Sequence, residues 1–346
     1  MVTIKEIAKA CKVSTATVSN IMNGKGKASD ATKELVLATA RKMNYVPNAA
    51  AQNLKTKRTR SIGVIVEDMT IFSIPDIVDG ITELCDEKKY QILLINLRLY
   101  KKYGDKYYPK TDFYEGVHDE IRKLMNKQVE AIIYVAAHER VLTCIPEDLP
   151  IPAVMAYGYT RSPRVPSVVV DDVDGSYRIT KYLIESGHRN IGIITGKKDS
   201  LHSQARLLGV QKAFFEEHIP FDPENIRTGD WFRPTGYQNT DYLLSKGVSV
   251  IFCFNDLMAG GVYDRFLEKG LVPGRDVSVA GYDDREVSAY YNPPLTTVRL
   301  PLHDIGYKAG ELIIDMLEGK NIRNGEEVIA QVPCRLQIRK SVKNVC

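Results

Sequence analysis

The chain has 346 residues, which is too long for one ordinary hydrophobic core and predicts two or three domains. Its 44% hydrophobic and 26% charged residues are typical of a globular protein, and no apolar run is long enough to cross a bilayer. The first residues resemble no secretion signal, and the six cysteines are widely spaced without a C-x-x-C pair. These features favour a cytoplasmic protein with reduced thiols over a secreted, disulfide-bonded or zinc-binding one.

The charge is divided unevenly along the chain. Residues 1–60 contain 12 Lys and Arg against 3 Asp and Glu, a net charge of +9, whereas the remaining residues carry −5. A small basic head on a mildly acidic body is typical of nucleic-acid binding. A solvated basic tail is the alternative, and the apolar periodicity of the head argues against it.

Three short helices are predicted for this head, over residues 1–47. Thr3 and Glu6 form a capping box, which opens a first helix with one apolar face. Ser14 caps a second helix that ends at Asn23-Gly24, with Val18 and Ile21 facing the first. A third helix before Pro47 is expected to close the core with its apolar positions, which are Leu35, Val36, Ala38, Thr39 and Met43.

The outward face of the second helix is suited to the major groove of DNA. Its side chains are small or can form hydrogen bonds, and they are Thr15, Ala16, Thr17, Ser19 and Asn20. Asn pairs with adenine through two hydrogen bonds, so Asn20 is a candidate base reader. Thr17 and Ser19 are equally able to cap backbone groups or to bind phosphates.

The head and the segment after it resemble one known family. T-I-K-E-I-A-K-A-C-K-V-S-T-A-T-V-S-N-I-M-N and Y-V-P-N-A-A-A-Q-N-L-K resemble the DNA-binding head and hinge of the lac/galactose repressor family. The resemblance implies that Thr15, Ala16 and Asn20 read an operator half-site. It also implies that residues 48–60 form a hinge that folds on DNA, where Leu54 wedges into the minor groove. A plain linker is the alternative for this segment, whose further expected DNA contacts are Asn48, Ala51 and Lys55.

From Ser61 onward, short apolar runs alternate with amphipathic stretches. Such alternation predicts α/β architecture, with parallel sheets covered by helices on both faces. We expect two doubly wound lobes, an N-terminal one over residues 61–159 plus 299–325 and a C-terminal one over residues 160–298 plus 326–346. Ligands of such sheets bind beyond the carboxyl ends of the strands, so the expected site is the cleft between the lobes. The predicted strands are Ile62–Val66, Ile92–Ile95, Ala131–Val135, Val154–Ala156, Val168–Val170, Ile191–Ile194, Val250–Phe252 and Val277–Ala280.

The body also resembles the effector domain of that family, which is itself similar to periplasmic sugar-binding proteins. The motifs that carry the resemblance are E-S-G-H-R-N-I-G-I-I, R-L-L-G, F-N-D-L-M-A-G-G, S-V-A-G-Y-D-D and P-P-L-T-T-V-R. The stretch Leu99–Tyr114, rich in Tyr and Lys, looks longer than its family counterpart. A surface loop, a lid and a dimer contact are all open interpretations of it.

The sequence favours a ligand pocket over a catalytic one. The G-x-S-x-G, P-loop, H-E-x-x-H and G-x-G-x-x-G motifs are absent from the chain, and no cofactor or metal is expected. His188 lies in a turn, where a helix-to-strand contact is a better interpretation than acid–base work. From the residues alone, Trp231 is either a stacking platform for a ligand or part of the core. Arg206 is either a ligand contact or a surface ion-pair partner. Asn255 and Asp283 are either ligand contacts or helix caps.

The resemblance implies roles for these residues. Arg206, Asn255 and Asp283 match effector-binding positions, and Trp231 matches a stacking aromatic, with Phe72, Ser73 and Asp174 as weaker matches. A saccharide is the expected effector. A nucleobase or nucleoside is the alternative, because purine-responsive relatives use an aromatic at the same place. The expected function is a homodimeric repressor on a palindromic operator, and a sugar-binding protein without a DNA role is the rival.

Overall fold

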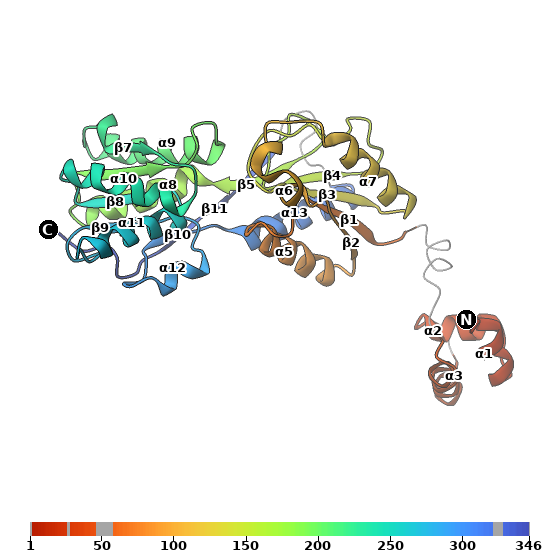
Figure 1. The fold of residues 1–346 in the computed structure, drawn as a ribbon. Helices are drawn as coiled ribbons and strands as arrows, with labels where there is room; N and C mark the ends of the chain where they lie inside the picture. The colour runs from red at the N-terminus through yellow and green to blue at the C-terminus, as the bar shows by residue number, and fades with distance from the viewer. Residues whose placement is uncertain (1, 26–27, 46–57, 321–327, 346) are drawn as a thin grey trace. The chain divides into compact units, whose positions relative to one another are not determined.

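The computed structural model describes residues 2–25, 28–45, 58–320 and 328–345, which belong to two compact units, Met1–Thr59 and Arg60–Cys346 (Figure 1). The expected DNA contacts of the hinge lie outside these described residues, and they are Asn48, Ala51, Leu54 and Lys55. No helix of the described part of the chain is both long and apolar enough to span a membrane. The five cysteines in this part are buried and free.

The head consists of three helices, α1 (Ile4–Cys11), α2 (Thr15–Met22) and α3 (Asp30–Lys42). The predicted capping box is confirmed, since the backbone N–H of Thr3 donates to the Glu6 carboxylate at 2.7 Å and that of Glu6 donates to the Thr3 hydroxyl at 3.4 Å. Lys12, in a left-handed conformation with φ 52°, ends α1. The hydroxyl of Ser14 caps α2 by accepting from the N–H of Thr17 at 3.0 Å.

The core of the head differs from the prediction in α3. Ile7, Val18 and Val36 are fully buried, but Leu35 is 52% exposed and Ala38 also faces solvent. Val36 and Ala40 are the residues of α3 that are buried, because their spacing of four places both on one face of the helix.

Removing the first cap provides a local test of the head. Thr3→Ala is expected to destabilise α1 by about 1 kcal/mol, because the N–H of Glu6 loses its side-chain acceptor and keeps only the backbone carbonyl of residue 3. Amide hydrogen exchange in α1 of the full chain should then accelerate by about five-fold if this opening limits exchange. The control is Lys5→Ala, at an exposed position of the same helix. Equal exchange in both variants would contradict the importance of the cap.

The second unit is built on two parallel sheets. One sheet has six strands in the order β11-β5-β4-β3-β1-β2, and we call the part built on it the N-lobe. Its strands are β1 (Ser61–Val66), β2 (Gln91–Asn96), β3 (Ala131–Val135), β4 (Ala153–Ala156), β5 (Ser167–Asp171) and β11 (Ile329–Pro333). Its helices are α5 (Ile74–Glu87), α6 (Leu99–Tyr103), the short η1 (Gly104–Tyr107), α7 (Tyr114–Asn126) and α13 (Leu302–Leu317).

The other sheet has four strands in the order β7-β6-β8-β9, and we call the part built on it the C-lobe (Figure 1). Its strands are β6 (Ile191–Thr195), β7 (Ile226–Thr228), β8 (Val250–Cys253) and β9 (Ser278–Ala280). Its helices are α8 (Asp172–Glu185), α9 (Leu201–Glu216), η2 (Pro223–Asn225), α10 (Arg233–Ser245), α11 (Asp256–Glu268) and α12 (Glu286–Tyr290). An antiparallel pair, β10 (Thr297–Arg299) and β12 (Arg335–Gln337), completes the unit.

Two doubly wound parallel sheets are therefore confirmed, but the expected lobe boundaries need correction. β5 and β11 pair with each other and belong to the N-lobe sheet, so the boundaries expected at 160 and 326 fall too early. The chain enters the C-lobe only at Asp172, where α8 begins directly after β5. β5 therefore belongs to the N-lobe and α8, which follows it directly, to the C-lobe, so the start of α8 lies at the junction of the two lobes.

In the N-lobe, α5 and α13 pack at backbone distance. A Cβ atom on Gly306 would lie 1.9 Å from the carbonyl oxygen of Ile77, so only glycine fits there. α13 follows β10 and returns the chain to the N-lobe, where it covers the sheet together with α5.

Candidate functional site

Residues that follow strands of both sheets meet at the junction of the two lobes. His138 and Glu139 follow β3 of the N-lobe, and Asp172 directly follows β5, the N-lobe strand that leads into α8. Trp231 follows β7 and Asp283 follows β9, both in the C-lobe. These side chains contact one another or share partners, so the carboxyl ends of both sheets face a common site, as expected for parallel sheets.

Arg206 of α9 is the charged centre of this site. Its Nε donates to Asp172 at 2.8 Å, and its NH1 group lies 3.5 Å from Asp283 and also donates to the carbonyl of Phe254. The guanidinium lies 3.7 Å from the centroid of the Tyr282 ring. Arg206 is 2% exposed, so this is an interior ion network and not the surface ion pair that was the alternative.

Trp231 forms an aromatic wall beside Arg206. The backbone of Trp231 has φ 78°, and its carbonyl accepts a hydrogen bond of 2.9 Å from the side chain of Asn255. The indole lies flat enough on Gly196 that a Cβ atom there would be 2.0 Å from the ring. Among the described residues, the shielded indole N–H has no hydrogen-bond partner, which leaves a donor available to a ligand.

His202 adds a second polar atom without a partner. Its Nδ1 lies 2.5 Å from Asp172 and 3.7 Å from Glu139, whereas its buried Nε2 has no hydrogen-bond partner in the described part of the chain. Burial alone would lower the pKa of His202, but the carboxylates of Glu139 and Asp172 raise it. Burial also raises the pKa of Glu139 to about 7.

The two aspartates around Arg206 differ in their electrostatics. Burial would raise the pKa of Asp172, but Arg206 and His202 outweigh it and hold this pKa below its usual range. For Asp283, burial dominates and raises the pKa, and Arg206 and Arg285 offset it only in part. Asp172, at 2.8 Å, is also the closer counter-ion of Arg206, and Asp283, at 3.5 Å, is the more weakly paired carboxyl group.

His138 of the N-lobe brings a ring to the same place. Its ring centroid is 4.8 Å from His202 and 6.2 Å from Trp231, both of the C-lobe, and its Nε2 lies 3.1 Å from the hydroxyl of Ser200. Burial lowers the pKa of His138 well below its usual range, so the ring is neutral at pH 7. Tyr157 completes the group of rings, at 5.3 Å from His202.

The residues expected from the sequence are only partly brought together. Arg206, Trp231 and Asp283 meet, and Asn255 caps α11 by accepting from the N–H of Met258 at 2.8 Å while it also holds Trp231. Asp283 caps no described helix. Asp174 pairs instead with Arg178 on the surface of α8, and Asp172 takes the place beside Arg206.

Of the two weaker candidates in the N-lobe, Phe72 lies at an adjacent pocket. Phe72 stacks against the guanidinium of Arg285 at 3.8 Å and lines a pocket of about 740 Å³ that Asp283 also lines. Ser73, next in the chain, is fully buried, and its hydroxyl has no partner within the residues that the structure describes.

Four residues of the site were not among those expected: Asp172, His202, Glu139 and His138. A sequence signal existed, since three of them directly follow predicted strands or their short extensions, where ligand contacts of such sheets concentrate. His188, by contrast, makes the predicted structural contacts, at 2.8 Å from the hydroxyl of Ser249 and 3.1 Å from the carbonyl of Lys343.

Glu139, Asp172 and His202 are close enough to share a metal ion, with ligand atoms within 4.8 Å of one another. Their oxygens already have partners, however. Asp172 holds Arg206 and His202, and Glu139 accepts from the N–H of Val170 at 2.8 Å. A cation would have to compete with the Arg206 guanidinium, so these groups fit an internal ion network better than a metal site.

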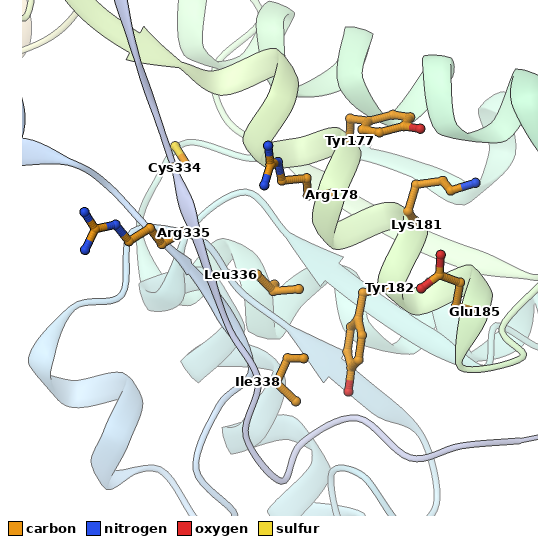
Figure 2. Close-up of a pocket in the computed structure, with 9 residues that line it drawn as sticks. All are labelled: Tyr177, Arg178, Lys181, Tyr182, Glu185, Cys334, Arg335, Leu336 and Ile338. Carbon is orange, nitrogen blue, oxygen red and sulfur yellow. The ribbon is translucent and has the colours of Figure 1, made fainter.

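A second concavity lies on the surface of the C-lobe, between α8 and the strand β12 (Figure 2). It measures about 660 Å³, and in Figure 2 the side chain of Arg178 extends toward Cys334, whereas that of Lys181 extends away from this strand. Its basic side chains already have acidic partners, Arg178 with Asp174, Lys181 with Glu217 and Arg335 with Asp304. It therefore offers a ligand less than the junction does.

In the head, the proposed base readers occupy one accessible face of α2. Thr15, Ala16 and Asn20 are exposed. The hydroxyl of Thr17 lies 2.8 Å from that of Ser14, and the backbone N–H of Thr17 is the group that Ser14 caps.

Comparison with known proteins gives a consistent family. Residues 3–48 match the bacterial regulatory proteins of the lacI family, and residues 180–342 match a periplasmic binding protein-like domain. The chain is 31% identical to the HTH-type transcriptional repressor PurR of Vibrio parahaemolyticus over the full length of both, and equally identical to PurR of Aliivibrio fischeri over 99% of each.

Solved structures agree on the fold. A Lac repressor dimer bound to operator and the anti-inducer ONPF is 26% identical, with a TM-score of 0.78 and 99% of each chain covered. A complex of the transcriptional regulator CelR with cellobiose is 25% identical, with a TM-score of 0.62, and covers 99% of this chain and 100% of its own.

Proposed function

We propose that the effector of this chain, which belongs to the LacI family of bacterial regulatory proteins, is a planar purine-type base bound at the lobe junction. The chain is a DNA-binding transcriptional repressor, as its relatives are. A purine base replaces the saccharide expected from the sequence, because the more similar relatives favour the nucleobase alternative. The relatives at 31% identity over the whole chain carry the name PurR, whereas the cellobiose-bound structure is more distant.

The observation that carries this proposal is the combination of rings and unpartnered polar atoms at the junction. The ring centroid of His138 lies 4.8 Å from that of His202 and 6.2 Å from that of Trp231, and aromatic rings such as these stack on a planar base. The indole N–H of Trp231 and Nε2 of His202 supply hydrogen-bonding positions that a base can satisfy with its ring nitrogens and oxygens. Arg206 and Asp283 add a donor and an acceptor at the edge.

We further propose a cytoplasmic homodimer whose two heads bind a palindromic operator, with Thr15, Ala16, Thr17 and Asn20 at the bases. The resemblance adds Asn48, Ala51, Leu54 and Lys55 as hinge contacts. Effector binding favours one arrangement of the lobes, and the difference in effector affinity between arrangements sets the change in operator affinity.

Fluorescence of Trp231, the single tryptophan of the chain, tests the effector class. We expect adenine, guanine or hypoxanthine to change its emission, with glucose and cellobiose as comparison ligands. Asp283→Asn should weaken binding of the active base by about ten-fold or more, because a buried charged partner contributes 1–3 kcal/mol. Asp264→Asn is the control, since Asp264 pairs with Arg233 on the exposed surface of the C-lobe. Binding of a sugar but no base would overturn the proposed effector.

A further inference from the structure

The segment Leu99–Tyr114, which looked longer than its family counterpart, is anchored firmly to the N-lobe at its start. The N–H of Leu99 donates to the carbonyl of Glu67 at 2.9 Å, and the N–H of Lys101 donates to the Asp68 carboxylate at 2.8 Å. Both acceptors lie directly after β1. The segment therefore starts at the carboxyl end of the sheet, next to the lobe junction.

A buried carboxylate fixes the middle of the segment. The Tyr107 hydroxyl donates to Glu67 at 3.0 Å, and Glu67, which is fully buried, also accepts from Tyr134 at 2.9 Å and from Arg140 at 2.7 Å. The Arg140 guanidinium in turn lies 5.3 Å from the Tyr107 ring and 5.0 Å from the Tyr108 ring. Tyr107 is 2% exposed, so this part of the segment is a built structural unit and not a solvated loop.

From this anchor, the segment reaches the C-lobe in two ways. Tyr108 stacks on His138, with ring centroids 5.4 Å apart and an interplanar angle of 16°, and His138 contacts Ser200, His202 and Trp231 of the C-lobe. Asp105 forms an ion pair with Lys197, which follows β6. One segment of the N-lobe therefore binds the opposite lobe both directly and through His138.

We propose that Leu99–Tyr114 is a clasp that holds the two lobes closed without an effector and positions His138 over Trp231. The contacts that carry it are the Asp105–Lys197 ion pair and the Tyr108–His138 stack. The clasp itself does not depend on which effector binds, and only its effect on effector affinity rests on the proposed function. Since a pre-closed site removes part of the conformational cost of binding, the clasp raises the affinity for a ligand of the closed form.

Trp231 reports the state of the clasp with no ligand present, because His138 covers it from the other lobe. The experiment is acrylamide quenching of Trp231 in the full-length protein. Tyr108→Ala and Lys197→Glu are each expected to raise the quenching constant, by about two-fold for the first. Tyr108→Phe, which keeps the ring, and Tyr103→Ala, which removes an exposed ring of the same segment, should quench like the wild type. Lys198→Glu is the charge control, since Lys198 is the exposed neighbour of Lys197.

The charge swap Asp105→Lys with Lys197→Glu separates the ion pair from a general loss of structure. It should restore the wild-type quenching constant that Lys197→Glu alters, while circular dichroism confirms that each variant is folded. Wild-type quenching in both Tyr108→Ala and Lys197→Glu would overturn the clasp. Because no ligand is added, a protein that binds no purine base still gives a clear answer here, so the two proposals fail separately.

Discussion

Arg206→Ala is expected to lower the free energy of unfolding by about 3–5 kcal/mol, because the buried carboxylates of Asp172 and Asp283 lose the guanidinium that both contact and keep only His202 and Arg285 as charged partners. The side chains of Asp172 and Asp283 are 1% and 6% exposed, so water cannot replace the guanidinium at either of them. The carbonyl of Phe254 loses its donor as well. The change is large because breaking a buried pair costs far more than the intact pair contributes.

The measurement is urea unfolding followed by circular dichroism, with a thermal melt as a second readout. Arg178→Ala is the matched control, since its ion pair with Asp174 is exposed and such pairs contribute only about 0–1 kcal/mol. Similar small losses in both variants would contradict a buried network at Arg206. This stability effect also explains why Asp283→Asn, a nearly isosteric change, is the better probe of effector binding.

Operator binding is expected to weaken by about 10³-fold or more between 50 and 200 mM salt, if the two heads of a dimer together neutralise six or more phosphates. The basis is the net charge of +9 on residues 1–60, against −5 on the rest of the chain. Each basic side chain at a phosphate releases a condensed counterion, so the logarithm of the affinity falls linearly with the logarithm of the salt concentration.

The measurement is a titration of fluorescently labelled operator at four salt concentrations. Binding of a purine base by the same preparation provides an internal control, because the ion pairs of Arg206 are buried and poorly screened by salt. A flat salt dependence of operator binding would contradict the electrostatic role of the head.

The head was predictable because its signals are local. Thr3 and Glu6 are three residues apart, as are Ser14 and Thr17, so their capping bonds follow from the sequence alone. The register of α3 was less certain, since several apolar residues compete for the core and Leu35 was assigned there wrongly. Packing against the other two helices buries Val36, which was expected in the core, and Ala40, which was not.

The site was predictable only where a family motif marked it. Arg206 and Asp283 lie in such motifs, and Trp231 was assigned from its match to a stacking aromatic of the family. Glu139, Asp172 and His202 come together from distant parts of the chain through the order of the strands. That order is not local information, as β5 and β11 show, because both were assigned to the wrong lobe. The contacts of Leu99–Tyr114 depend in the same way on the junction, which no short sequence pattern encodes.

The pairing of β5 with β11 has a consequence for the order of events during synthesis. β5 lies inside the N-lobe sheet, yet its outer neighbour β11 is made roughly 160 residues later, which takes about 8–32 s at 5–20 residues per second. Until then, the edge of β5 offers unpaired backbone groups to any other strand nearby. The C-lobe sheet, whose four strands are all complete by Ala280, can form during this interval. The nascent N-lobe therefore waits with an open edge for one of the last strands of the chain, and this interval is when it is most exposed to aggregation and to chaperones.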